Sequence, residues 1–259
     1  MKTPLLVAYG GGINSTAMLV GMAERGIRPD AILFADTGGE RPETYAYVKT
    51  VSDWCVAQGM PAIVTVDGGR KYPSLEAECL GSETLPSIAY GFKRCSLKWK
   101  VEPQEHWGRR WQPAIDSWAA GHHVEKAIGY HAGETHRSVK SADKAYAYRY
   151  FLREWRWYQE DCLAAVERAG LPKAGKSACF FCPSTKPREI LELQERHPDL
   201  FERALTIERK ARDSGNLQTV KGLGRNWAWE TFVDFQNRQC ALPLGETEAP
   251  CGCYDGEDD

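Results

Sequence analysis

The chain has 259 residues, enough for one large α/β domain or for one domain with a short appendage. A formal net charge of −2 disfavours a generally basic, nucleic-acid- or membrane-binding surface, although a local basic patch is compatible with it. No apolar run reaches the roughly 18 residues of a membrane span, so we expect no membrane partner. Nine cysteines, an odd number in a chain of enzyme size, favour reduced thiols and therefore the cytoplasm.

Short apolar runs alternate with segments of helical spacing in the first half of the chain. This alternation predicts βαβ units, hence a doubly wound, mostly parallel α/β sheet with helices on both faces. The expected strands are 5–9, 31–35, 62–66 and 124–130, and the expected helices are 15–25, 43–58, 145–169 and 187–212.

Two regions are less regular. Residues 67–123 are rich in Gly, Pro and Trp, and we expect long functional loops there, with a helix at 95–107. The signals weaken after 213, so we divide the chain into an α/β domain at 1–212 and a helical C-terminal extension at 213–259.

A glycine-rich turn joins the first expected strand to the first expected helix. Glycines allow the backbone to approach an anion, and the free amides at a helix N-terminus favour phosphate there. A tight structural connection is the alternative explanation of the same residues. The candidate phosphate-binding residues are Gly10, Gly11, Gly12, Asn14, Ser15 and Thr16.

Two further motifs follow expected strands, where open α/β sheets bind ligands. One runs from Asp36 to Thr44 and contains Thr37, Gly38 and Glu40, and the other runs from Gly129 to Arg137 and contains Glu134. The glycine turn resembles the pyrophosphate loop of the PP-loop (adenine-nucleotide α-hydrolase-like) superfamily. The motif that begins at Asp36 resembles the Asp-Thr-Gly-x-x-x-Pro-Glu-Thr pattern of phosphoadenosine phosphosulfate (PAPS) reductases. The motif that begins at Gly129 resembles the Gly-x-Arg-x-x-Glu-x-x-Arg pattern of the same family.

The resemblance implies an adenine nucleotide, PAPS or ATP, bound by these three motifs, with Asp36 and Arg137 in the chemistry. In this interpretation the Arg137 guanidinium donates to the nucleotide phosphates, and Glu134 orients the guanidinium. The alternative is that Arg137 and Glu134 form a salt bridge with each other in a loop. Asn14 stands where the family has Asp and His131 where it has Arg. Asp36 or Glu40 then becomes the candidate carboxylate for Mg²⁺.

A Cys-x-x-Cys turn is formed by Cys179 and Cys182, a spacing that lets two thiolates bind one metal centre. Residues 93–103 around Cys95 resemble the Cys-Cys-x-x-x-Lys-x-x-Pro segment of iron–sulfur sulfonucleotide reductases, with Ser96 in place of the second cysteine. The resemblance implies a 4Fe–4S cluster on three cysteines, with one iron open as in the tRNA-thiolating members of the superfamily. Zinc with a fourth ligand, such as Cys162, is the alternative.

Three further features have two interpretations each. Cys251 in the tail faintly resembles the attacking cysteine of thiol-dependent PAPS reductases, or belongs to an exposed or metal-binding tail. The aromatic and basic stretch 146–158 is either a stacking platform for single-stranded nucleic acid or part of the core. The cations around Cys95 either neutralise a sulfate or phosphate or form a solvated helix face, and they are Lys93, Arg94, Lys98 and Lys100.

These features lead to three hypotheses of function. The first is a PAPS-reductase-like oxidoreductase that draws on a thiol reductant protein. The second is an ATP-pyrophosphatase-type sulfurtransferase that takes sulfur from a donor and modifies a nucleic acid. The third is a metal-stapled protein that binds nucleotides without turnover, motivated by Asn14.

Overall fold

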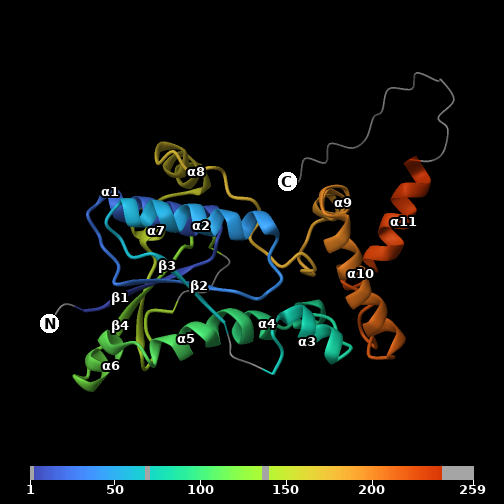
Figure 1. Ribbon diagram of the computed structural model, residues 1–259, viewed down its shortest axis with the longest axis horizontal. Helices are drawn as coiled ribbons and strands as arrows, with labels where there is room; N and C mark the ends of the chain where they lie inside the picture. The colour runs from blue at the N-terminus through green and yellow to red at the C-terminus, as the bar shows by residue number, and fades with distance from the viewer. Residues whose placement is uncertain (1–2, 68–70, 136–139, 241–259) are drawn as a thin grey trace.

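The computed structural model describes residues 3–67, 71–135 and 140–240. Five strands form one sheet in the order β3-β2-β1-β4-β5, and every neighbouring pair is parallel. From β1 the chain winds outward through β2 and β3, then returns to place β4 on the other side of β1 (Figure 1). The order therefore reverses between β1 and β4, which creates a crevice at their carboxyl ends. The strands are β1 Leu5–Tyr9, β2 Ala31–Ala35, β3 Ile63–Val66, β4 Val124–Ile128 and β5 Tyr146–Arg149.

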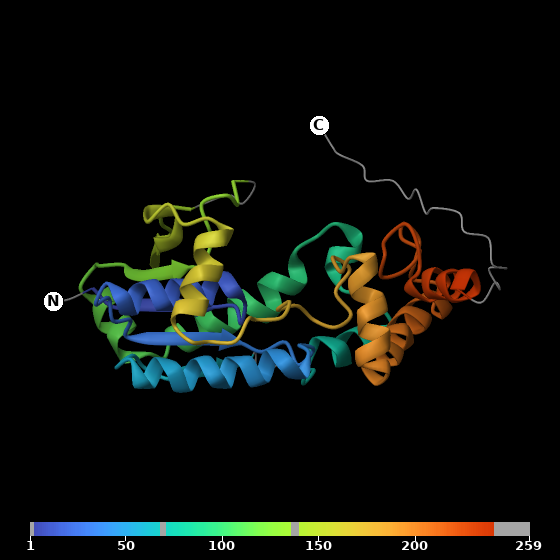
Figure 2. The same ribbon diagram turned by 90° about the horizontal axis from the view of Figure 1, so that it is seen from above.

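Helices cover both faces of this sheet (Figures 1 and 2). Successive side chains of a strand point to opposite faces; accordingly Val7 packs in the core under one layer of helices, and Leu6 packs in the core under the other. The first layer contains α1 Ile13–Glu24, α2 Pro42–Ala57, α7 Phe151–Glu154 and α8 Gln159–Arg168, and the second contains α5 Glu102–Gly108 and α6 Gln112–Ala119. The predicted fold class, doubly wound α/β with helices on both faces, is confirmed.

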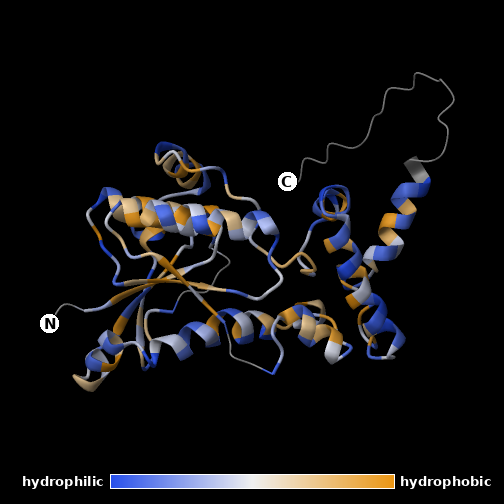
Figure 3. Ribbon diagram, in the orientation of Figure 1, coloured by the Kyte–Doolittle hydropathy of each residue, from blue (hydrophilic) through white to orange (hydrophobic). Residues whose placement is uncertain are grey.

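A second hydrophobic core lies beyond the sheet, and the fully buried Trp99, Phe181 and Trp229 belong to it. Figure 3 shows the strands as mostly hydrophobic and the helices of this part as mixed, as expected for helices that bury one side only. The core contains residues from both sides of position 212, so the division at 212/213 stays a prediction. Its helices are α3 Leu75–Gly81, the 3₁₀ turn η1 Ser87–Tyr90, α9 Pro187–Arg196, α10 Pro198–Asp213 and α11 Trp229–Cys240.

Two segments predicted as single helices are not single helices in the structure. Residues 145–169 contain β5, α7 and α8, because alternating aromatic residues in Tyr146–Arg149 suit a strand and Arg156 takes a left-handed φ of 57°. Residues 187–212 form two helices that meet at His197, since the proline after it disfavours helical geometry there. Within the described residues no helix is long and apolar enough to cross a membrane.

The predicted helix at 95–107 is an irregular rod. It consists of α4 Arg94–Ser96, a π-helical turn η2 Leu97–Val101, and α5. Pro103 cannot donate to the carbonyl four residues earlier, that of Trp99, and a wider turn there relieves the clash that its ring would cause. This rod brings residues 95–100 to the end of the sheet.

Candidate active site

The glycine turn follows β1, and α1 begins directly after it. Gly12 is the N-cap, and no side chain caps the helix, which leaves its first amides for a ligand. Gly11 has a left-handed φ of 72°, and a Cβ there would lie 3.2 Å from the Phe34 ring and 3.3 Å from the Thr44 methyl group. The sequence needs glycine at position 11 for both reasons.

A cavity of about 630 Å³ opens beside this turn, where β1 and β4 end. It is lined both by residues of the nucleotide motifs and by all three predicted metal ligands. One cavity therefore unites the two halves of the predicted site. From the predictions it contains Gly10, Gly12, Asn14, Ser15, Thr37, Gly129 and Glu134, together with Cys95, Cys179 and Cys182.

Gly129 brings the end of β4 against the start of α1. A Cβ at this position would lie 2.8 Å from the Ser15 Cα and 3.0 Å from its amide nitrogen. Both are backbone atoms of the helix, so only glycine allows this approach.

Two predicted phosphate ligands have another role. Ser15 and Thr16 each donate a hydroxyl hydrogen bond of 3.0 Å to the Gly12 carbonyl, and Thr16 is fully buried beside the Tyr9 hydroxyl. Thr16 does not line the cavity, whereas Ser15 does. These hydroxyls fix the shape of the turn, and its backbone amides are the groups that suit phosphate.

Asn14 and Glu134 meet although 120 residues separate them. The Asn14 amide nitrogen donates to the Glu134 carboxylate at 3.2 Å, and the His131 amide donates to the same oxygen at 3.1 Å. Among the acidic residues of the predicted nucleotide motifs that the structure describes, Glu134 is the one that lines the cavity.

Asp36 and Gly38 do not line the cavity. One Asp36 oxygen accepts from the Gly38 amide at 2.7 Å and from the Tyr45 hydroxyl at 2.8 Å, an arrangement that closes the turn after β2. Gly38 has a left-handed φ of 66° in that turn. The catalytic role of Asp36 stays a prediction.

The segment after β2 binds the Cys-x-x-Cys turn, which the sequence did not indicate. The Thr37 hydroxyl lies 3.1 Å from the Cys179 sulfur, and the Phe180 amide donates to the Gly39 carbonyl at 2.8 Å. A Cβ on Gly39 would lie 2.7 Å from the Phe181 ring. The predicted motif from Asp36 to Thr44 therefore contacts the Cys-x-x-Cys turn and helps to fix its position at the end of β2.

Glu40 is fully buried, and it forms an ion pair with Lys100 at 3.1 Å. Among the residues that the structure describes, the second Glu40 oxygen has no hydrogen-bond partner. Burial lowers the pKa of Lys100, but the nearby Glu40 carboxylate and the thiols of Cys179 and Cys182 together outweigh it and raise the pKa above its usual value. Lys100 lines the cavity as a permanent cation, and the cluster of cations around Cys95 was the sequence signal for it. Glu40 itself does not line the cavity, and its carboxylate is paired with Lys100. Its role as a Mg²⁺ ligand stays a prediction.

The three cysteines are free thiols in partly buried positions. Burial, followed by the charge of Glu40, raises the pKa of Cys179 to about 12, and burial also raises the pKa of Cys182. Binding to a metal would displace the thiol protons. Within the described ranges no three His, Cys, Asp or Glu side chains are grouped closely enough to hold one metal ion. The arrangement therefore does not favour a single zinc ion, which needs its ligands around one point. Three soft sulfur donors around one cavity suit an iron–sulfur cluster better, because a cluster spans more widely spaced thiolates.

Several predictions fall elsewhere. Arg137 and Cys251 lie outside the described residues. The aromatic stretch 146–158 belongs only in part to the core: Tyr146 and Phe151 are buried, Trp155 is half-buried under the Arg25 guanidinium at 4.3 Å, and Tyr158 is exposed. Cys162 is buried in α8, in the core under the first helical layer. Ser177, which lines the cavity and donates to the Gly10 carbonyl, was missed, although it lies only two residues before Cys179 of the Cys-x-x-Cys turn.

Fold and site together define a class of protein. It is an α/β protein with a cavity at the ends of β1 and β4, where the strand order reverses, and this cavity is lined by an amide-rich turn and by three cysteines. No protein-family model matches the sequence, and no curated protein matches it. Among solved structures the chain is similar to the U34-tRNA thiolase NcsA from Methanococcus maripaludis with its 4Fe–4S cluster. The identity is 16%, the match covers 82% of this chain and 72% of that chain, and the TM-score is 0.44.

Proposed function

We propose that the chain is an ATP-dependent sulfurtransferase of the PP-loop, ATP-pyrophosphatase type, with a nucleic-acid base as acceptor. The observation that carries the proposal is the shared cavity, because Gly12 and Asn14 at the phosphate turn line the same space as Cys95, Cys179 and Cys182. Nucleotide activation and sulfur chemistry would then take place in one cavity.

The reaction replaces a ring carbonyl oxygen of the base by sulfur. In the first step the carbonyl oxygen attacks the α-phosphorus of ATP and pyrophosphate leaves. In the second step hydrosulfide attacks the activated carbon, and AMP leaves with the former carbonyl oxygen. The amides at the start of α1 stabilise the charge of the leaving pyrophosphate. Glu134, which lines the cavity, would supply a carboxylate ligand if Mg²⁺ accompanies the nucleotide. No electrons are gained or lost, so no reductant is required.

Three residues hold the sulfur-handling centre in this proposal: Cys95, Cys179 and Cys182. If these three thiolates held a 4Fe–4S cluster, it would supply a site for inorganic sulfide beside the activated base. Ser96, in the place of a second cysteine, lines the cavity and would offer no thiolate to such a cluster. The Lys100 ammonium offsets the negative charge of the thiolates.

The decisive experiment is anaerobic purification with iron, zinc and sulfide analysis, followed by incubation with ATP, sulfide and unmodified RNA. We expect iron, pyrophosphate and thiolated RNA. Cys95→Ser and Cys182→Ser should lose iron and thiolation while still binding ATP. Cys162→Ala is the matched control, since that thiol is buried in α8 and should affect stability alone. Full thiolation by the two serine variants would refute the proposal.

A PAPS-reductase-like activity is the second candidate, and Lys100 favours it because an ammonium beside the cysteines suits a sulfonate. A cysteine thiolate, Cys251 in the sequence prediction, would attack the sulfonyl sulfur and release adenosine bisphosphate. A second thiol from a reductant protein would then form a disulfide and release sulfite. Incubation with PAPS and a dithiol separates the candidates: sulfite supports this one, pyrophosphate with RNA supports the first, and neither product indicates a nucleotide-binding protein without turnover.

A further inference from the structure

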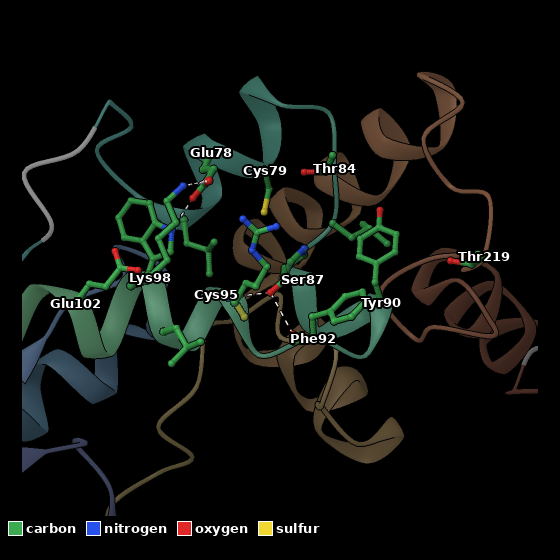
Figure 4. Close-up of a pocket in the computed structure, with 16 residues that line it drawn as sticks. Glu78, Cys79, Thr84, Ser87, Tyr90, Phe92, Cys95, Lys98, Glu102 and Thr219 are labelled. Atoms are coloured by element: carbon green, nitrogen blue, oxygen red, sulfur yellow. Dashed lines mark hydrogen bonds and ion pairs between the residues drawn. The ribbon is translucent and has the colours of Figure 1, made fainter. Parts of the chain in front are cut away.

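A second cavity, of about 1000 Å³, adjoins the first (Figure 4). Its walls come from α3, η1, the irregular rod after it, and Thr219 in the segment between α10 and α11. Leu75, Pro86 and Cys95 line both cavities. Cys95 therefore stands at the boundary between the nucleotide cavity and this second space.

The interior of the second cavity offers apolar surface. Leu75, Leu85 and Trp99 are buried in the second core and contribute to the wall. The Glu78 carboxylate is occupied by the Trp99 indole nitrogen at 2.6 Å and by the Lys98 ammonium. Since these polar groups are satisfied, the interior suits a flat, largely apolar ring better than a charged ligand.

The rim has the opposite character. Phe92 is 63% exposed, an unusual position for a phenyl ring, and Figure 4 places it beside Tyr90 at one end of the cavity. Arg94 lines the same rim and is exposed, and within the described part of the chain it makes no side-chain hydrogen bond or ion pair. Exposed rings next to unpaired cations are the features that bind single-stranded nucleic acid, through base stacking and phosphate contacts.

We propose that this second cavity is the acceptor site, which takes an unpaired base of a single-stranded nucleic acid while ATP occupies the first. The base stacks on Phe92 and Tyr90, Arg94 and Lys93 contact the flanking phosphates, and the ring enters toward Cys95. This inference rests on the proposed function, which needs an acceptor ring to meet the activated nucleotide at the boundary between the two cavities.

The test is fluorescence anisotropy of a labelled eight-residue oligouridylate with the full chain. Phe92→Ala should raise the dissociation constant about tenfold, as expected for loss of one stacked base. Arg94→Ala should also weaken binding, and it should reduce the slope of log K against log salt by about 0.7, the value for one phosphate contact on a single strand. Phe235→Ala, at a 57%-exposed ring on α11, and Arg28→Ala, at an exposed arginine after α1, are the matched controls and should bind like the wild type.

A photo-crosslink gives an independent readout. An oligonucleotide that carries 5-iodouridine should crosslink to the peptide containing Tyr90 and Phe92. Crosslinks confined to other peptides, unchanged affinity in both rim variants, or no oligonucleotide binding at all would overturn the acceptor site. Calorimetry with ATP separates the two proposals: ATP binding that persists while the rim variants behave like the wild type refutes the acceptor site alone, whereas absent ATP binding refutes the proposed function.

Discussion

The Asn14 side chain donates a hydrogen bond of 3.2 Å to the Glu134 carboxylate, and both residues line the cavity beside the glycine turn. An aspartate at position 14, as in the PP-loop pattern, would place two carboxylates in that contact. Like charges so close together require a cation or a proton between them. Asn14 thus leaves a single carboxylate, Glu134, at this point, and the arrangement needs no metal to be stable.

Asn14→Asp should therefore make nucleotide binding depend on Mg²⁺. In the presence of EDTA the second carboxylate repels the phosphates, and we expect ATP affinity to fall about tenfold, equivalent to about 1.4 kcal/mol. Added Mg²⁺ should restore most of the affinity, because two carboxylates form a better oxygen site for that ion. Calorimetry with and without Mg²⁺ measures both effects. Asn14→Ala, which only removes the hydrogen bond, is the control and should show no such Mg²⁺ dependence; equal affinities of Asn14→Asp and wild type in EDTA would contradict the explanation.

The sheet could be predicted because buried parallel strands are short apolar runs, and the glycine turn because Gly11 and Gly12 leave few alternatives between a strand and a helix. The fifth strand could not be predicted in the same way. Tyr146–Arg149 alternates in character and is followed by helical residues, so its pairing with β4 depends on tertiary contacts that local patterns do not encode.

The sequence indicated many of the residues that line the cavity, but it did not indicate which of them contact each other. Pairing of Glu40 with Lys100 links residues 60 apart, and the Thr37 contact with Cys179 links residues 142 apart. Asp36 looked like a metal or catalytic carboxylate because it follows a strand, yet its oxygen is engaged by Gly38 and Tyr45. Such partners are set by how distant segments pack.

Gly129→Ala should weaken nucleotide binding more than it weakens the fold. The added Cβ would lie 2.8 Å from a backbone atom of Ser15, so the start of α1 must move away from the end of β4. We expect the dissociation constant for ATP to rise about tenfold by calorimetry, equivalent to about 1.4 kcal/mol. Gly59→Ala is the control: its φ of 71° costs about 1–2 kcal/mol of stability, with no neighbour within 4 Å and no effect on binding. Wild-type affinity in Gly129→Ala would show that the contact does not shape the site.

Lys100→Ala should destabilise the protein, because it leaves the buried Glu40 carboxylate without its cation. The cost of an unsatisfied buried group is about 1–3 kcal/mol, and the lower part of that range applies because the Lys100 side chain is 38% exposed. The double variant Lys100→Ala with Glu40→Gln removes the buried charge and should recover part of the loss. Chemical denaturation of the two single variants and the double variant tests this. Additive effects of the two substitutions would mean that the ion pair has no energetic coupling.

Lys126→Met should stabilise the protein at neutral pH. Lys126 lies in β4 with an exposed fraction of only 4%, and its ammonium is 5.0 Å from the Tyr146 ring centre. Burial, only partly opposed by the charges of Glu105 and Asp143, lowers the pKa of Lys126 from 10.5. Replacing a buried charge by an apolar side chain of similar length should raise the free energy of unfolding by about 1–2 kcal/mol at pH 7.

The pH dependence of this gain provides the sharper check. Between the lowered pKa of Lys126 in the folded protein and 10.5 in the unfolded chain, the unfolded chain binds more protons, so wild-type stability at this site rises with pH. The advantage of Lys126→Met should therefore shrink as the pH rises from 7 toward 10.5. Melting temperatures of both proteins across that range measure it, with Lys49→Met, at an exposed lysine paired to Asp53, as the control. A variant less stable than the wild type at pH 7, or a stability difference that stays constant with pH, would show that the buried Lys126 charge does not lower the free energy of unfolding.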